Sequence, residues 1–162
     1  IHSLIWLSLS GYVKDDIDSI LGSFYNGIYW LNKAIKKMKK IKISKNLNHT
    51  WLIDLDGTLV KHNYYLSSKN DLFLKGTGSF LKKIPKNDTI ILLTSRKKKF
   101  KKSTISFLLR NKIRYNFIIF DLPFGERILI NDIKPKKNLK TAISINLKRD
   151  FGFSKIKIIN EK

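Results

Sequence analysis

From Thr50 onward the chain alternates short apolar runs with segments of helical periodicity. The runs cover residues 51–55, 89–94, 116–120, 127–131 and 141–146, and the helical segments between them cover 76–84 and 100–113. Apolar runs this short are typical of buried strands, and a helix between two strands is typical of a βαβ unit. The pattern therefore predicts an α/β domain with a parallel sheet covered on both faces, in which strand 51–55 lies in the middle.

Polar side chains follow three of these predicted strands. The three groups are Asp54, Asp56 and Thr58; then Thr94, Ser95 and Arg96; then Asn131 and Asp132. Ligands of open parallel sheets bind outside the carboxyl ends of the strands, so we expect the groups at one edge. Carboxylates in that position can hold Mg²⁺, and one of them can attack phosphorus.

Each part of a phosphoryl-transfer site has a candidate at this edge. A phosphoryl group repels a carboxylate nucleophile unless a metal and hydrogen-bond donors surround it. We assign Asp54 as the nucleophile and Asp56 as the acid that protonates the leaving oxygen and then activates water. Thr94 would donate a hydroxyl hydrogen bond, and Asp132 would complete a metal shell with Asp54 and Asp56. The expected substrate-binding residues are Gly57, which permits a tight turn, Thr58, Ser95, Arg96 and Asn131.

These motifs carry a family resemblance over roughly residues 50–146. The set Asp54-x-Asp56-Gly-Thr-Leu, then Thr94 after a strand, then Asn131-Asp132 after another, resembles the haloacid dehalogenase (HAD) superfamily of phosphatases. The resemblance implies a Rossmann-like three-layer core, Mg²⁺ and an aspartyl-phosphate intermediate formed on Asp54. It also implies that Asp56 is the acid and base, and that Thr94 is the hydroxyl residue after the second strand.

One position departs from the family pattern. Related small phosphatases carry Lys-Pro before the last acidic motif, whereas this chain has Leu122 before Pro123. Arg127 is the closest cation in the sequence, and we assign it the role of the missing lysine. Lys112 and Lys134 are the alternatives.

The resemblance also suggests a substrate. The stretch from Asp56 to Thr94 contains one core helix and leaves only residues 61–75 as a flap, with no room for a large cap domain. The chain is similar to small phosphatases encoded with capsule and surface-polysaccharide genes, which implies a phosphorylated sugar or glycan precursor as substrate.

Two other functions stay open. A polynucleotide end phosphatase is favoured by the net charge of +21 and by a lysine run beside Thr94, made of Lys97, Lys98, Lys99, Lys101 and Lys102. The 28 lysines stand against only 5 arginines, however, and arginine is what nucleic-acid readers mostly use. A non-catalytic HAD-like docking module is the third function, because the motif lysine is missing.

The amino-terminal part has a different pattern. We divide the chain into a helical segment, 1–47, and a phosphatase domain, 48–162, joined through a polar linker at 42–49. A long amphipathic helix is predicted by an apolar stripe at spacings of three and four: Ile17, Ile20, Leu21, Phe24, Ile28, Leu31, Ile35 and Met38. We expect the stripe to pack on the phosphatase domain or on a second copy, or to dock to an upstream domain.

Composition narrows the remaining classes of protein to which the chain could belong. The chain has no cysteine, which excludes disulfides and thiolate metal sites. No apolar stretch reaches the length of a membrane span, and residues 1–12 lack the basic leader of a secretory signal. We therefore expect a cytoplasmic protein. Because the first residue is Ile, we also expect it to be part of a longer polypeptide.

Overall fold

The computed structural model describes residues 14, 16–31, 38–68, 70–134 and 139–161. The chain divides into two compact units, one ending at Lys39 and the other running from Lys40 to Lys162. In the first unit, residues 16–31 form a helix, as the apolar spacing predicts. Of the two last stripe residues, Met38 is not helical, and Ile35 lies outside the described residues. No helix among the described residues is long and apolar enough to cross a membrane.

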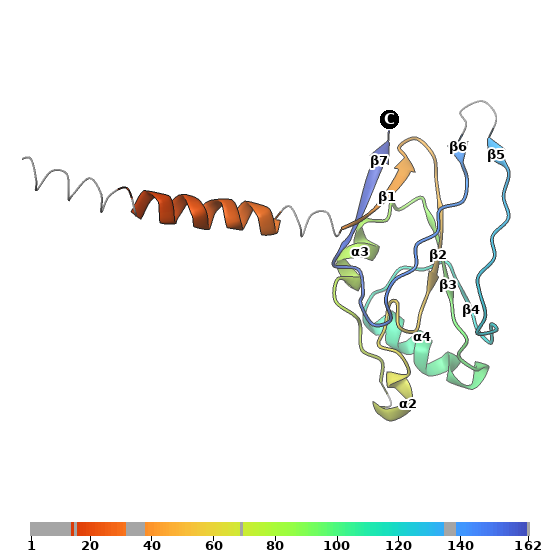
Figure 1. Cartoon of the computed structure of the whole chain (residues 1–162). Coiled ribbons are helices and arrows are strands. Elements are labelled where there is room, and N and C mark those ends of the chain that lie inside the picture. Colours follow the sequence, from red (N-terminus) through yellow and green to blue (C-terminus); the bar gives the residue numbers. More distant parts are fainter. Residues whose placement is uncertain (1–13, 15, 32–37, 69, 135–138, 162) are drawn as a thin grey trace, which may run out of the picture. The chain divides into compact units, whose positions relative to one another are not determined.

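The centre of the second unit is a parallel sheet of three strands (Figure 1). These are β2 (Thr50–Asp54), β3 (Thr89–Leu93) and β4 (Phe117–Ile119), in the order β2-β3-β4. The register sets Ile53 opposite Leu92 and Leu92 opposite Ile118. The prediction that strand 51–55 lies in the middle is wrong for this sheet, because β3 pairs on both sides and β2 is an edge strand.

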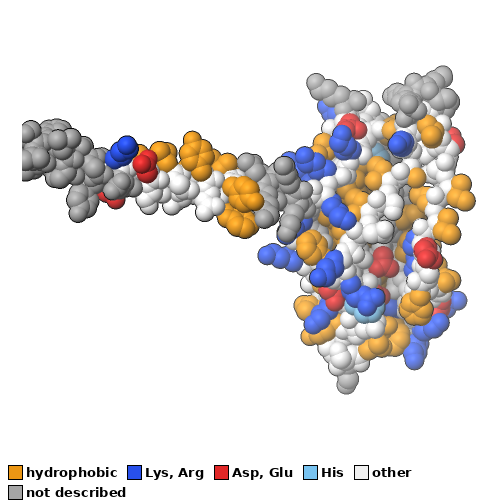
Figure 2. Space-filling model, viewed as in Figure 1, with side chains coloured by type: hydrophobic (Ala, Val, Ile, Leu, Met, Phe, Trp, Pro, Cys, Tyr) orange, Lys and Arg blue, Asp and Glu red, His pale blue; other side chains and the backbone are white. Residues whose placement is uncertain are grey.

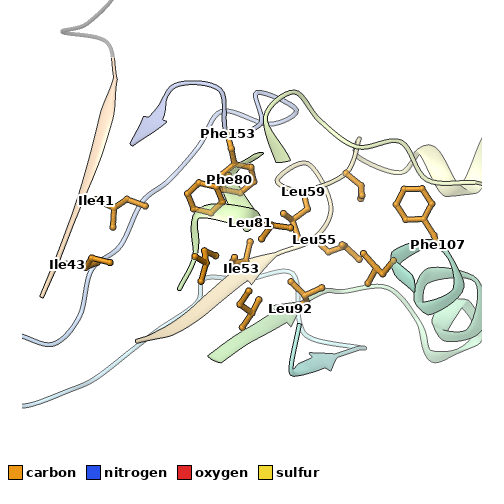
Figure 3. Close-up of a cluster of buried hydrophobic side chains, with 14 residues drawn as sticks. Ile41, Ile43, Ile53, Leu55, Leu59, Phe80, Leu81, Leu92, Phe107 and Phe153 are labelled. Carbon is orange, nitrogen blue, oxygen red and sulfur yellow. The ribbon is translucent and has the colours of Figure 1, made fainter. Parts of the chain in front are cut away.

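In the second unit, two helices contribute to one hydrophobic core. Phe80 and Leu81 come from α3 (Thr77–Lys83), and Phe107 and Leu108 come from α4 (Lys101–Arg110). They cluster with the inward side chains of β2 and β3, among them Ile53 and Leu92 (Figure 3). Parallel strands added in one direction through right-handed crossovers place their connecting helices on the same face.

The opposite face of the sheet carries exposed apolar side chains. Leu52 is 48% exposed and Phe117 is 61% exposed. The mixed α/β class is confirmed, whereas the three-layer, Rossmann-like arrangement stays a prediction.

The two predicted strands at 127–131 and 141–146 do not form. The structure instead has a short antiparallel pair in this region, β5 (Ile133–Lys134) with β6 (Leu139–Lys140). Ile128, Leu129 and Ile130 form an apolar run as in a buried strand, yet they are 84%, 51% and 89% exposed. An apolar run is typical of a strand, but a strand also needs a neighbour for its backbone hydrogen bonds. Residues 127–131 have no such neighbour in the described part of the chain.

The predicted linker at 42–49 contains a strand. β1 (Lys39–Ser44) pairs with β7 (Ile156–Glu161), more than a hundred residues away in the chain. Ile41 and Ile43 of β1 are buried in the core. The division between the units therefore falls at residues 39 and 40, before the boundary at 47 and 48 expected from the sequence. The remaining elements are α2 (Tyr64–Ser68), inside the predicted flap, and the short 3₁₀ helix η1 (Lys98–Phe100).

Candidate active site

The carboxyl ends of β2 and β3 bring the first two predicted groups together. Asp54 is the last residue of β2 and lies opposite Leu93 in the register, so Thr94 directly follows the neighbouring position. After β2 the chain turns sharply, because the N–H groups of Leu59 and Val60 both bond the carbonyl of Leu55. The turn holds Asp56 beside Thr94, whose hydroxyl donates a 2.9 Å hydrogen bond to its carboxylate.

Gly57 permits the turn that the sequence analysis expected. Its φ of 79° lies in the left-handed region, which a residue without a Cβ adopts freely. Its N–H donates to the carbonyl of Val60 at 2.7 Å. That donor therefore stabilises the turn in this structure and is not directed at a ligand.

Asp54 is partly buried, and its carboxylate accepts a hydrogen bond from the Thr58 hydroxyl at 3.0 Å. Burial raises the pKa of Asp54, and the nearby Asp56 charge raises it further. The Thr58 bond and the nearby Arg127 and His62 side chains lower this pKa, but they do not offset the burial. Burial therefore disfavours the charged form of Asp54 in this structure.

Asp56 has the opposite environment. Both of its oxygens are bonded: Arg96 Nε lies 3.1 Å from Oδ1 and 2.9 Å from Oδ2, and Arg96 Nη2 lies 2.7 Å from Oδ1. The Thr94 hydroxyl adds its bond to Oδ2, and the Arg96 backbone N–H donates to that hydroxyl at 3.1 Å. Asp56 is thus held in one position by a guanidinium and a hydroxyl, whereas the described bond to the Asp54 side chain comes from a hydroxyl alone.

Arg96, expected from the sequence to bind substrate, is buried. Its side chain is only 1% exposed. Its second partner is Asp71, whose two oxygens accept at 2.7 and 2.6 Å. Burial would lower the pKa of Arg96, but the bonds to Asp71 and Asp56 raise it above its ordinary value. The guanidinium is therefore permanently charged, and its N–H groups donate to side chains inside the protein.

The third predicted group lies in an exposed segment. Asp132 has a 70% exposed side chain, 3.8 Å from Lys134 Nζ, and its backbone carbonyl accepts from the Thr141 hydroxyl. Asn131 Nδ2 donates to the Thr141 carbonyl at 3.4 Å. Among the described residues no group of three His, Cys, Asp or Glu side chains is arranged to hold a metal. The expected set of Asp54, Asp56 and Asp132 is therefore not assembled in this structure.

Arg127, which the sequence assigns to the place of the missing motif lysine, donates from Nη1 to the carbonyls of Pro123 and Gly125. Its positive charge lowers the pKa of Asp54. The Ser95 hydroxyl donates to the same Pro123 carbonyl at 3.3 Å, so Ser95 contacts this segment. Lys134 lies by Asp132 instead.

Sequence reasoning missed two residues of the site, Asp71 and Tyr65. Asp71 accepts from Arg96, and the Tyr65 ring lies 3.9 Å from the guanidinium carbon. Both belong to the predicted flap, 61–75. The sequence did hold a signal for Asp71. The chain has only 12 acidic residues, and Asp71 is the acidic residue of a flap that is otherwise uncharged or basic.

Lysine and arginine side chains spread over the face shown in Figure 2, with hydrophobic and other side chains between them. On that face they do not gather into one continuous stripe. Comparison with family models finds no match for this chain, and comparisons with curated proteins and with solved structures find none either.

Proposed function

We propose that this chain is a phosphomonoester hydrolase of the HAD type, with Asp54 as nucleophile and Asp56 as acid and base. The observation that carries the proposal is that the carboxyl ends of β2 and β3 bring two carboxylates and a hydroxyl, Asp54, Asp56 and Thr94, to one edge of the sheet. Asp56 is fixed there by Arg96 and Thr94, and Asp54 accepts a hydrogen bond from Thr58. The division of roles between the two carboxylates is the one that the family resemblance implies.

The first half-reaction would form a bond between an Asp54 oxygen and phosphorus, as the bond from phosphorus to the leaving oxygen breaks. Asp56 would give its proton to that oxygen, so that the alcohol leaves neutral. In the second half, Asp56 would take a proton from water as the water oxygen attacks phosphorus. The Asp54–phosphorus bond then breaks, which releases phosphate and leaves Asp54 as a carboxylate and Asp56 protonated, as both were at the start.

Asp54 fits a magnesium ligand, because Mg²⁺ prefers carboxylate oxygens and, among the described residues, Thr58 bonds only one of the two Asp54 oxygens. When bound, Mg²⁺ would offset the repulsion between this carboxylate and the phosphate. Asp56 and Asp132 are assigned to the same shell by the sequence alone. Arg127 is proposed as the cation in place of the motif lysine, because it is positively charged and lowers the pKa of Asp54.

The proposed substrate is a phosphorylated sugar or glycan precursor, in a cytoplasmic route to surface polysaccharide, and this choice rests on the resemblance. A polynucleotide end phosphatase is the second candidate, because the basic residues Lys98 and Lys99 are exposed on η1 close after Thr94. The amino-terminal helix would mediate dimerisation or docking to an upstream domain.

A phosphatase screen tests the proposal. Sugar phosphates and oligonucleotides with 3′- or 5′-phosphates are incubated with the protein, with and without Mg²⁺, and released phosphate is measured. We expect Mg²⁺-dependent release from sugar phosphates, and none from the Asp54→Asn variant. Release from oligonucleotides alone would favour the second candidate. No release from any ester would favour the third candidate, a non-catalytic docking module.

A further inference from the structure

The guanidinium of Arg96 bonds two carboxylates from different parts of the chain. Asp56 lies 40 positions before it and Asp71 lies 25 positions before it. All five N–H groups are used: Nε bonds Asp56, Nη2 bonds both Asp56 and Asp71, and Nη1 bonds Asp71 and the Thr104 hydroxyl. A side chain in this condition has no donor left for a phosphate.

The second partner ties down the flap, residues 61–75. Asp71 lies in the flap and its side chain is 5% exposed, so its charge depends on Arg96 for compensation. Tyr65, in α2 of the same flap, places its ring against the guanidinium and edge-on to Phe100, with ring centroids 4.8 Å apart. The flap is thus joined to Arg96 by two charged hydrogen bonds and by one ring contact.

We infer that Arg96 is a positioning residue, which holds Asp56 in place and fastens the flap to it through Asp71. The inference rests on the proposed function for its catalytic half. The proton of Asp56 must reach the leaving oxygen, so an acid that drifts by an ångström transfers it poorly. Arg96 restrains both Asp56 oxygens and fixes one wall of the site in the same contact.

The planar fork of arginine is required for this role. Lysine would keep the positive charge but could not bond two carboxylates in parallel pairs. Arg96→Lys therefore removes the paired hydrogen bonds to the two carboxylates while it keeps the positive charge. Asp71→Asn removes the negative charge of Asp71 while keeping the shape of the side chain, and it leaves the Asp56 contacts in place. The matched controls are Arg110→Lys, at an exposed arginine of α4, and Asp18→Asn, at an exposed aspartate of the helix 16–31.

Amide hydrogen exchange tests the flap directly and needs no activity. Hydrogen bonds to charged groups contribute about 1.5–3 kcal/mol each, so losing one should speed exchange in residues 61–75 by about 10- to 100-fold. We expect this in both Arg96→Lys and Asp71→Asn, and no change in either control. Unchanged flap exchange in both variants would overturn the link between Arg96 and the flap.

Leaving-group dependence tests the positioning of Asp56. A 4-nitrophenyl ester needs little help from an acid, whereas an alkyl phosphate such as glycerol phosphate needs a proton on its leaving oxygen. We expect Arg96→Lys to lower kcat/KM, which reports the first half-reaction, at least about tenfold more for the alkyl ester than for the aryl ester. An equal loss of kcat/KM for both esters would overturn the positioning of Asp56 as the acid. A wild-type protein inactive on both would refute the proposed function, and exchange would still decide whether Arg96 holds the flap.

Discussion

The bond between Asp88 and Trp51 joins two neighbouring strands and can be tested quantitatively. Asp88 directly precedes β3, and its side chain is 1% exposed. Its carboxylate accepts from Trp51 Nε1 at 2.8 Å and from the His49 backbone N–H at 3.0 Å. Trp51 belongs to β2, three residues before Asp54, and its ring packs edge-on against Phe80. The pair therefore fixes the strand that ends in the proposed nucleophile.

The expected loss follows from these two bonds. A hydrogen bond to a charged group contributes about 1.5–3 kcal/mol to the free energy of unfolding. Asp88→Ala removes both acceptor atoms, so we expect a loss of about 3 kcal/mol or more. Asp88→Asn keeps one carbonyl acceptor, and we expect about half that loss. The His49 ring is not counted in this sum, because its Nδ1 lies 3.3 Å from the carboxylate without hydrogen-bond geometry.

Urea unfolding followed by far-ultraviolet circular dichroism measures these losses. Trp51→Phe completes a double-mutant cycle with Asp88→Asn, and we expect a coupling of about 1–2 kcal/mol between the two sites. Asp18→Asn, at an exposed aspartate, is the control, and should change stability by less than about 0.5 kcal/mol. A loss below about 0.5 kcal/mol in Asp88→Ala, or a coupling near zero, would refute the reasoning.

Three further predictions concern the nucleophile, the core and a turn. Because burial raises the Asp54 pKa, the folded state binds this proton more tightly, and stability falls as the pH rises past the ordinary value of 3.8. Asp54→Asn should therefore gain stability over wild type between acidic and neutral pH, seen as a growing difference in Tm; a difference independent of pH would contradict this. Leu92→Ala, at a fully buried position, should cost about 2–5 kcal/mol in urea unfolding, against almost nothing for exposed Leu66→Ala. Gly76→Ala should lower Tm, because Gly76 has a φ of 84° and a Cβ there would lie 2.6 Å from the Ser154 backbone nitrogen; an unchanged Tm would show that the turn relaxes.

Local patterns in the sequence predicted the first part of the site correctly. Apolar alternation marked β2 and β3, and parallel strands end at the same edge of a sheet. Asp56 and Thr94 were therefore expected side by side, and the structure joins them by a hydrogen bond. The helix at residues 16–31 was predictable for the same reason, since helical periodicity is written in neighbours three and four positions apart.

The partners of those residues were decided only by the tertiary structure. Nothing near Arg96 in the sequence indicates that it bonds Asp56 and Asp71, or that β1 pairs with β7. The apolar run at 127–131 predicted a strand, but in the described part of the chain it has no neighbour to pair with. Periodicity is a property of a short segment and can be read from it. Pairing between distant segments depends on which of many weak, competing contacts bury most apolar surface and satisfy most polar groups, and only the whole folded chain determines that balance.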